Sequence, residues 1–148
     1  MKQIKIIILS GIIAGVAMLM SCGGGDDPSP QQQMTNQLIN GGEAWTVSGG
    51  TVTVDGTNVT SDWNGFTIKF TEDTYTTSGS IASEVWPSSG TWDFANETTT
   101  SNLQRGDGTS MNVSIENDVL TITFDAPWGV NGRTTSIGGG YTFVLNGN

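Results

Sequence analysis

The sequence predicts an all-β domain, an antiparallel meander of about eight strands that closes into a small barrel. Threonine is abundant and leucine is scarce after residue 34, and Thr, Val, Ile and the aromatic residues together favour strands. Apolar and polar residues alternate with a period of two in segment after segment, which indicates one buried and one solvated face. A two-sheet β-sandwich produces the same pattern and remains the alternative.

Turn-forming residues separate the alternating segments, such as Glu72-Asp73, Gly106-Asp107-Gly108 and Glu116-Asn117-Asp118. Only Met34 to Asn40 could be helical, as a short turn. We expect strands near residues 44–54, 66–71, 74–78, 90–95, 100–105, 110–116, 119–125 and 140–146. The side chains expected to face inward are Trp45, Val47, Val54, Phe66, Ile68, Phe70, Trp92, Phe94, Met111, Val113, Ile115, Leu120, Ile122, Phe124, Tyr141, Phe143 and Leu145.

The N-terminus has the layout of a secretory signal. Lys2 and Lys5 supply positive charge, and the uncharged segment from Ile6 to Met20 follows. This segment is too short to span a bilayer comfortably, because a spanning helix needs about 20 apolar residues. Residues 1–21 are therefore predicted to be a signal peptide.

The signal ends in Leu19-Met20-Ser21-Cys22, which resembles the lipobox of bacterial lipoproteins. The resemblance implies cleavage before Cys22, lipidation of its sulfur and anchoring to a membrane. Cys22 is the only cysteine, so an intrachain disulfide is impossible although the chain is exported. The alternative is an ordinary signal peptide followed by an incidental cysteine.

Residues 22–34 are predicted to be the lipidated cysteine and a flexible tether, because Gly, Pro, Ser and Gln dominate the segment. Asp26 and Asp27 resemble the acidic surface-export tags of Bacteroidota lipoproteins. That resemblance implies an outer-membrane location at the cell surface. Solvated linker charges are the alternative reading of the pair.

The charge balance excludes nucleic acid as a partner. Once residues 1–21 are removed, three basic residues (Lys69, Arg105 and Arg133) stand against 14 acidic ones, and such a surface repels phosphate backbones. The chain has no histidine, which removes the commonest general base and most zinc sites. We expect no cofactor, no metal and no catalytic residues.

Several short segments of the domain form a recognisable set: Trp45 and residues 54–60, 65–70, 89–94, 120–124 and 141–143. Together they resemble the lipocalin-like lipoproteins of Bacteroidota. The resemblance covers roughly residues 42 to 145, but lipocalins proper carry Gly-x-Trp on the first strand and this chain has Gly42-Glu43-Ala44-Trp45. It implies that residues 35–148 form a small barrel of unassigned role, and it transfers no catalytic residue.

Three tryptophans, Trp63, Trp86 and Trp128, lie in loop-like sequence and are the candidate ligand-binding residues. Aromatic faces beside Asn and Asp could stack on a glycan, and a small hydrophobic ligand could occupy a barrel mouth. The favoured alternative is that these rings cap the core at the barrel ends.

Other motifs are explained by turn chemistry. Asp55, Asn58 and Asp62 are oxygen ligands at close spacing but lack the spacing of an EF-hand loop. Arg105-Gly106-Asp107 spells an adhesion tripeptide but lies at a predicted hairpin tip. A glycoside hydrolase needs two rigidly held carboxylates, and the best choices, Asp93 and Asp125, fall on the predicted wet face.

Two functions remain for a non-catalytic outer-membrane lipoprotein. The first is a binding or interaction module for a glycan or a small hydrophobic ligand. The second is a structural or accessory subunit of an outer-membrane assembly, with the barrel packed solid. The many large rings on the inward list favour a filled interior.

Overall fold

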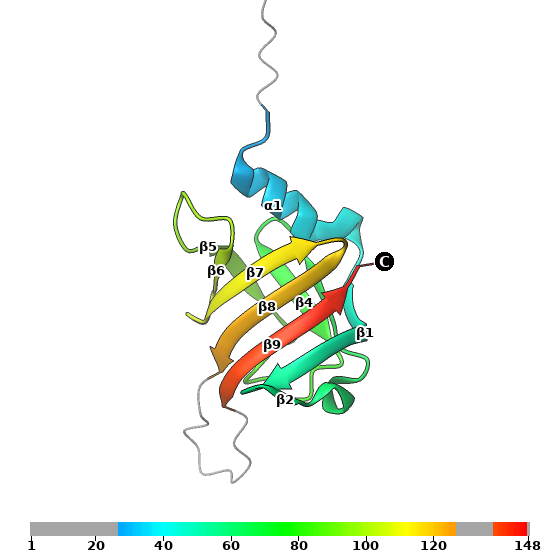
Figure 1. Ribbon diagram of the computed structural model, residues 1–148. Coiled ribbons are helices and arrows are strands. Elements are labelled where there is room, and N and C mark those ends of the chain that lie inside the picture. The colour runs from blue at the N-terminus through cyan, green and yellow to red at the C-terminus, as the bar shows by residue number, and fades with distance from the viewer. Residues whose placement is uncertain (1–26, 127–137, 148) are drawn as a thin grey trace, which may run out of the picture.

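The computed structural model of the protein describes residues 27–126 and 138–147 (Figure 1). Within these ranges one antiparallel sheet follows the chain order from β3 to β9, and β1 pairs with both β3 and β9, so the sheet closes into a barrel. This confirms the predicted barrel and excludes the two-sheet sandwich. The strands are β1 (Trp45–Val54), β2 (Thr57–Asn58), β3 (Thr67–Phe70), β4 (Thr74–Ser78), β5 (Ser89–Phe94), β6 (Asn102–Arg105), β7 (Ser110–Glu116), β8 (Val119–Ala126) and β9 (Gly139–Asn146).

The helix α1 (Pro30–Ile39) begins before the predicted helical turn, so the prediction of a flexible tether through residue 34 is wrong at its end. Ser29 accepts a hydrogen bond from the Gln32 backbone, and the Gln32 side chain accepts one from the Ser29 backbone. This capping box, with proline at the first helical position, fixes where the helix starts. Composition alone did not reveal it, because Ser, Pro and Gln are also common in linkers.

Helix α1 closes one end of the barrel. Its residues Met34 and Leu38 are buried, and the indole N–H of Trp45 donates to the Leu38 carbonyl at 2.8 Å. The amide of Gln31 donates to two carbonyls of the β5–β6 connection, at Asn96 and Thr99, each at 2.8 Å. The short 3₁₀ helix η1 (Asn40–Gly42) then leads into β1.

Strand β1 changes its inward face midway. Trp45 and Val47 are buried before the change and Val52 is buried after it, so the alternation shifts by one residue between them. Gly49 has a φ of +74°, and a Cβ at Gly50 would collide with the Val144 carbonyl. The two glycines therefore form a bulge that bends the strand from β3 towards β9.

The barrel interior is filled. Every residue on the predicted inward list is buried or packs partly buried against the core. Prediction missed several further buried residues, among them Val52, Tyr75, Val85 and Leu103. The rings of Trp63, Phe66, Trp86, Phe124 and Phe143 form one continuous cluster with centroid separations of 4.9–6.0 Å.

The two barrel ends differ. The chain enters the described part beside α1, whereas β8 ends at Ala126 and β9 begins at Gly139 at the opposite end (Figure 1). No helix in residues 27–126 and 138–147 is long and apolar enough to cross a membrane.

Candidate functional site

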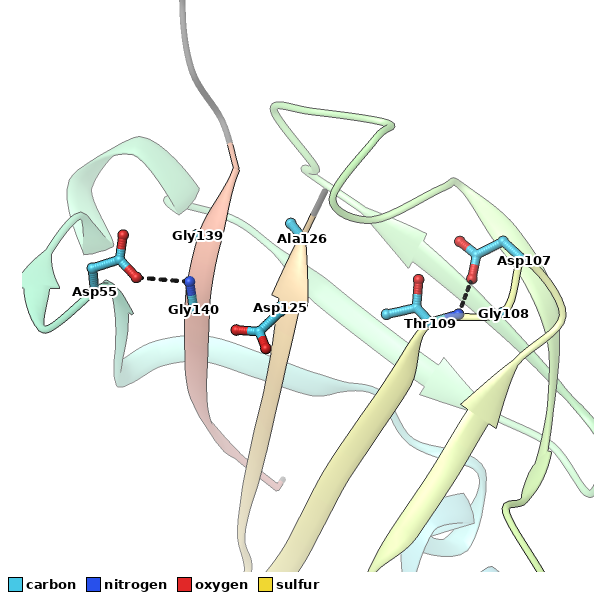
Figure 2. A pocket seen from close by; sticks show the side chains of 8 residues that line it. All are labelled: Asp55, Asp107, Gly108, Thr109, Asp125, Ala126, Gly139 and Gly140. Atoms are coloured by element: carbon cyan, nitrogen blue, oxygen red, sulfur yellow. Dashed lines mark hydrogen bonds between the residues drawn. The ribbon is translucent and has the colours of Figure 1, made fainter. Parts of the chain in front are cut away.

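An acidic hollow of about 590 Å³ lies at the barrel end opposite α1 (Figure 2). Its three carboxylates, Asp55, Asp107 and Asp125, come from the β1–β2 turn, the β6–β7 turn and β8 respectively. The other lining residues have small side chains or none, which leaves the carboxylates as the main functional groups of the hollow. The other lining residues are Gly108, Thr109, Ala126, Gly139 and Gly140.

Asp55 is fixed against the start of β9. Its carboxylate accepts a hydrogen bond from the Gly140 N–H at 2.8 Å, and its own backbone N–H donates to the Gly140 carbonyl at 2.9 Å. A Cβ at Gly140 would lie 3.3 Å from an oxygen of Asp55 and 3.4 Å from an oxygen of Asp125. The carboxylates of Asp55 and Asp125 therefore lie on either side of Gly140 and close to each other.

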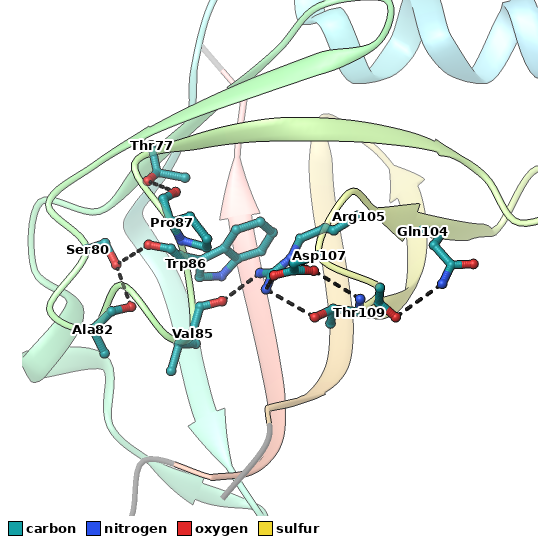
Figure 3. Close-up of polar contacts among 11 residues, drawn as sticks. Thr77, Ser80, Ala82, Val85, Trp86, Pro87, Gln104, Arg105, Asp107 and Thr109 are labelled. Carbon is teal, nitrogen blue, oxygen red and sulfur yellow. Dashed lines mark hydrogen bonds and ion pairs between the residues drawn. The ribbon is translucent and has the colours of Figure 1, made fainter. Parts of the chain in front are cut away.

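Asp107 is held by Arg105, the one charged residue buried among the described residues. The guanidinium donates to both carboxylate oxygens of Asp107, at 3.2 and 2.5 Å, in a bidentate pair (Figure 3). Partial burial raises the pKa of Asp107. The hydrogen bonds from Arg105 and Thr109 outweigh that effect and lower the pKa to about 2. Asp107 is therefore ionised throughout the neutral range.

Arg105 also connects the β6–β7 turn to the β4–β5 connection. Its guanidinium donates to the Val85 carbonyl at 2.6 Å and lies 5.0 Å from the ring centroid of Trp86 and 5.5 Å from that of Phe124. The side chain is thus paired with a carboxylate, hydrogen-bonded to backbone and stacked on aromatic faces, which together compensate for burying its charge. Because Arg105 is only 2% exposed, the Arg105-Gly106-Asp107 tripeptide does not present its arginine to a partner.

The β4–β5 connection carries Trp86 into the barrel. The hydroxyl of Ser80 donates to the Ala82 and Trp86 carbonyls, at 3.1 and 2.9 Å, and the hydroxyl of Thr77 donates to the Pro87 carbonyl at 2.9 Å. These bonds hold the connection in a compact shape (Figure 3). The indole nitrogen of Trp86 has no hydrogen-bond partner among the described residues.

Two of the three candidate tryptophans are buried. Trp63, in the 3₁₀ helix η2 (Thr60–Trp63), is 1% exposed and Trp86 is 0% exposed, so neither offers a free face to a sugar. Their burial agrees with the capping interpretation. Trp128 lies outside the described residues, as do Cys22 and Asp26, and Asp27 is exposed at the start of the described part.

The remaining candidate carboxylates do not form a pair. Asp125 lines the acidic hollow, whereas Asp93 lines a different hollow beside β5, so the predicted best choices for a hydrolase are not brought together. In the described ranges no three His, Cys, Asp or Glu side chains converge as a metal-binding group. Asn58 instead accepts a hydrogen bond from the Thr60 backbone as part of its turn.

Sequence reasoning missed the role of Arg105, although the sequence contains a signal for it. Leu103 is buried on β6, and a period of two places Arg105 on the same inward face. The contact of Asp55 with Gly140 has no local signal, since Asp55 lies in the β1–β2 turn and Gly140 on the last strand, β9, far apart in the sequence. Comparison with protein-family models, with curated proteins and with solved structures finds no match to this chain.

Proposed function

We propose that the chain is a non-catalytic surface lipoprotein, anchored to the outer membrane through Cys22, whose barrel is a solid scaffold for interactions on its outside. The signal-like segment, the lipobox-like Leu19 to Cys22 and the acidic pair Asp26-Asp27 support the address. The resemblance to lipocalin-like lipoproteins of Bacteroidota agrees with it.

The filled interior is the observation that carries the scaffold role. A carrier of small ligands in a barrel of about eight strands needs interior space beyond that occupied by its own side chains. Here the rings of Trp63, Phe66, Trp86 and Phe143 occupy that space. Truncating one such ring would cost about 3–5 kcal/mol, so a ligand that displaced one would face a comparable barrier. A partner that binds the outer surface, by contrast, would leave the packing of these rings intact.

The anchored barrel has a defined near and far end. The tether joins the domain at α1, so the end closed by α1 lies nearer the membrane and the acidic hollow lies farther from it (Figure 1). Asp55, Asp107 and Asp125 then face away from the lipid. This orientation keeps the carboxylates of the hollow away from anionic headgroups, which would repel them.

Lipidation is tested with the Cys22→Ser variant. The wild-type protein is expected to incorporate labelled palmitate in its bacterial host and to partition into the detergent phase of Triton X-114. The variant should do neither. A matched control, Cys22→Ser combined with Ser110→Cys, retains one thiol per chain and should remain unlipidated. A Cys22→Ser protein that still incorporates palmitate would overturn the anchor.

Surface exposure is tested by protease treatment of intact cells. The wild-type protein should be degraded, whereas the variant with Asp26 and Asp27 both changed to Ala should be protected. The control changes Asp93 and Glu97 to Ala, which removes the same charge from exposed positions of the domain. Protection of the wild-type protein would place it on the inner leaflet.

A further inference from the structure

Another hollow, of about 530 Å³, lies against helix α1 at the barrel end nearer the proposed anchor. Two parts of the chain form it. Pro28 precedes the helix, Gln32, Thr35 and Asn36 belong to it, and Glu72 comes from the β3–β4 turn. We call it the α1 hollow. It shares no lining residue with the acidic hollow at the opposite end of the barrel.

The polar groups of the α1 hollow are not used by the fold. Within the described part of the chain, the side chains of Thr35, Asn36 and Glu72 make no hydrogen bond or ion pair. Gln32 accepts a hydrogen bond from the Ser29 backbone through its side-chain oxygen, which leaves its amide N–H groups free. The hollow therefore offers N–H donors on the α1 side and a carboxylate acceptor on the β3–β4 side.

The α1 hollow is held close to the proposed lipid anchor. Pro28, which lines it, lies six residues after Cys22. Six residues span at most about 20–22 Å, so a lipid on Cys22 keeps the hollow within that distance of the headgroups. Linkage of this kind gives two groups a high effective concentration, and a contact too weak to form between separate molecules is then populated.

Charge limits which headgroup can enter. Glu72 places a carboxylate in the hollow, and two more acidic residues adjoin the lining, since Asp27 precedes Pro28 and Asp73 follows Glu72. All three acidic side chains are exposed. An anionic headgroup is repelled by such a set. A zwitterionic headgroup avoids the repulsion, because its ammonium can pair with the carboxylate while its phosphate accepts hydrogen bonds from the amides.

We propose that the α1 hollow binds the phosphoethanolamine headgroup of a lipid in the membrane that carries the anchor. The ammonium donates to the Glu72 carboxylate, and the phosphate accepts from the side-chain amides of Gln32 and Asn36. A choline headgroup matches less well, because its methylated ammonium has no N–H to donate. Binding of this kind holds the α1 end of the barrel against the bilayer.

This inference rests on the proposed lipid anchor and adds a second contact between the protein and the same membrane. Recognition of the headgroup can be measured without a bilayer, so the two proposals can fail separately. A lipidated protein that does not bind the headgroup would refute the α1 hollow alone. A protein that binds the headgroup but carries no lipid would refute the anchor alone.

The test is an NMR titration of the full chain, labelled with ¹⁵N in its bacterial host and purified in mild detergent, with soluble glycerophosphoethanolamine. The side-chain amide signals of Gln32 and Asn36 should shift and reach saturation. Glycerophosphocholine should bind about fivefold more weakly, as expected when an exposed hydrogen-bonded charge pair is lost. Glycerophosphoglycerol, which is anionic, should leave these signals unchanged.

Glu72→Gln should weaken the binding of glycerophosphoethanolamine by about fivefold, because it removes the partner of the ammonium. The matched control is Asp73→Asn, which removes the same charge from the adjacent exposed position outside the hollow. Its binding should stay within about twofold of wild type, since solvent screens a charge that makes no contact. Absence of saturable shifts, equal binding of the three compounds or equal loss in the control would overturn the proposal.

A second arm separates a membrane lipid from a soluble phosphoethanolamine compound. A fluorophore on Gln37→Cys lies at an exposed position of α1 outside the hollow. In proteoliposomes with an acceptor lipid, its energy transfer should be stronger with phosphatidylethanolamine present than in phosphatidylcholine alone. Glu72→Gln should abolish that difference. Binding of glycerophosphoethanolamine without any such difference would overturn the membrane contact and assign the hollow to a soluble compound.

Discussion

The guanidinium of Arg105 stacks on Trp86, which the β4–β5 connection inserts into the barrel, and hydrogen-bonds to the carbonyl of its neighbour Val85. Arg105, on the strand β6 that pairs with β5, thereby fastens the β4–β5 connection over the core. Its partner Asp107 has a side chain that is 43% exposed, so the pair reaches from the interior to the rim of the acidic hollow.

Arg105→Ala should destabilise the protein by about 3 kcal/mol. The change leaves the Val85 carbonyl without its donor and removes the packing of the guanidinium on Trp86 and Phe124. Asp107→Asn should cost less, about 1 kcal/mol, because water reaches and screens that carboxylate. Denaturant unfolding measures both free energies, and the exposed Asp93→Asn is the control. An Arg105→Ala protein as stable as wild type would contradict the fastening role.

The acid stability of the protein should depend on Asp107. Its pKa is lowered from 3.8 to about 2 in the folded state, so the ionised carboxylate favours folding at neutral pH. That contribution is complete above the unfolded pKa and is lost as the pH falls from about 4 towards 2. The free energy of unfolding of wild type relative to Asp107→Asn should therefore shrink across that window. A difference that does not change between pH 6 and pH 2 would contradict the assignment.

The buried tryptophans should behave as core residues. Trp63→Ala and Trp86→Ala should each lower the free energy of unfolding by about 3–5 kcal/mol, and by more than 1.5 kcal/mol at the least. Ile81→Ala is the control, because Ile81 is 60% exposed and exposed positions shift stability by less than about 0.5 kcal/mol. Chemical denaturation followed by circular dichroism avoids reliance on the tryptophan fluorescence that these variants alter. Near-neutral results at both sites would show that the rings are not part of the packed core.

The bulge in β1 should tolerate no side chain at Gly50. Gly50→Ala should destabilise by more than about 2 kcal/mol, because its Cβ would collide with the Val144 carbonyl on the neighbouring strand. Gly56→Ala is the matched control, since its φ of +81° imposes strain but no atom lies within 4 Å of the added Cβ. That control should cost about 1–2 kcal/mol. Thermal melts that rank the two variants in the opposite order would refute the bulge.

The proposed orientation on the membrane can be tested by energy transfer. Ser110 and Glu116 are exposed and stand at opposite ends of β7, so a fluorophore on Ser110→Cys or Glu116→Cys reports the two barrel ends from one strand. In proteoliposomes with an acceptor lipid, transfer should be stronger from Glu116→Cys, at the α1 end. Residues 22–29 reach about 26–29 Å when extended, which limits how far the domain can turn. Equal transfer would refute a fixed near and far end.

Prediction from sequence succeeded where structure follows local periodicity. Strands β7 and β8 match their predicted ranges almost residue for residue, because Met111 to Ile115 and Leu120 to Phe124 alternate without interruption. Strand β1 was found and Trp45, Val47 and Val54 were correctly expected to face inward, but Val52 and the change of face before it were missed. The change of face at Gly49 and Gly50 involves close contact of Gly50 with Val144, a residue far away in the sequence.

The candidate site was less accessible to prediction for the same reason. Trp63 and Trp86 are buried because the connections that carry them fold into the barrel. No hydrophobic periodicity in the sequence of these connections predicts that inward path. The acidic hollow joins Asp55, Asp107 and Asp125 across the closed barrel. Their meeting is set by strand pairing over the whole chain, whereas the Arg105-Asp107 pair is local and could have been inferred from the alternation on β6.

The pairing of β1 with β9 also governs when this protein can fold. The first long strand of the domain has no partner along its second half until the last strand has arrived, apart from the two residues of β2. Contacts between distant parts of a chain raise its contact order, and all-β barrels of this kind fold in milliseconds to seconds. A chain that emerges from its N-terminus first must therefore wait, unclosed, for its final residues. The proposed export, if it carries unfolded polypeptide, would suit such a domain, because the ring of strands cannot close before β9 has crossed.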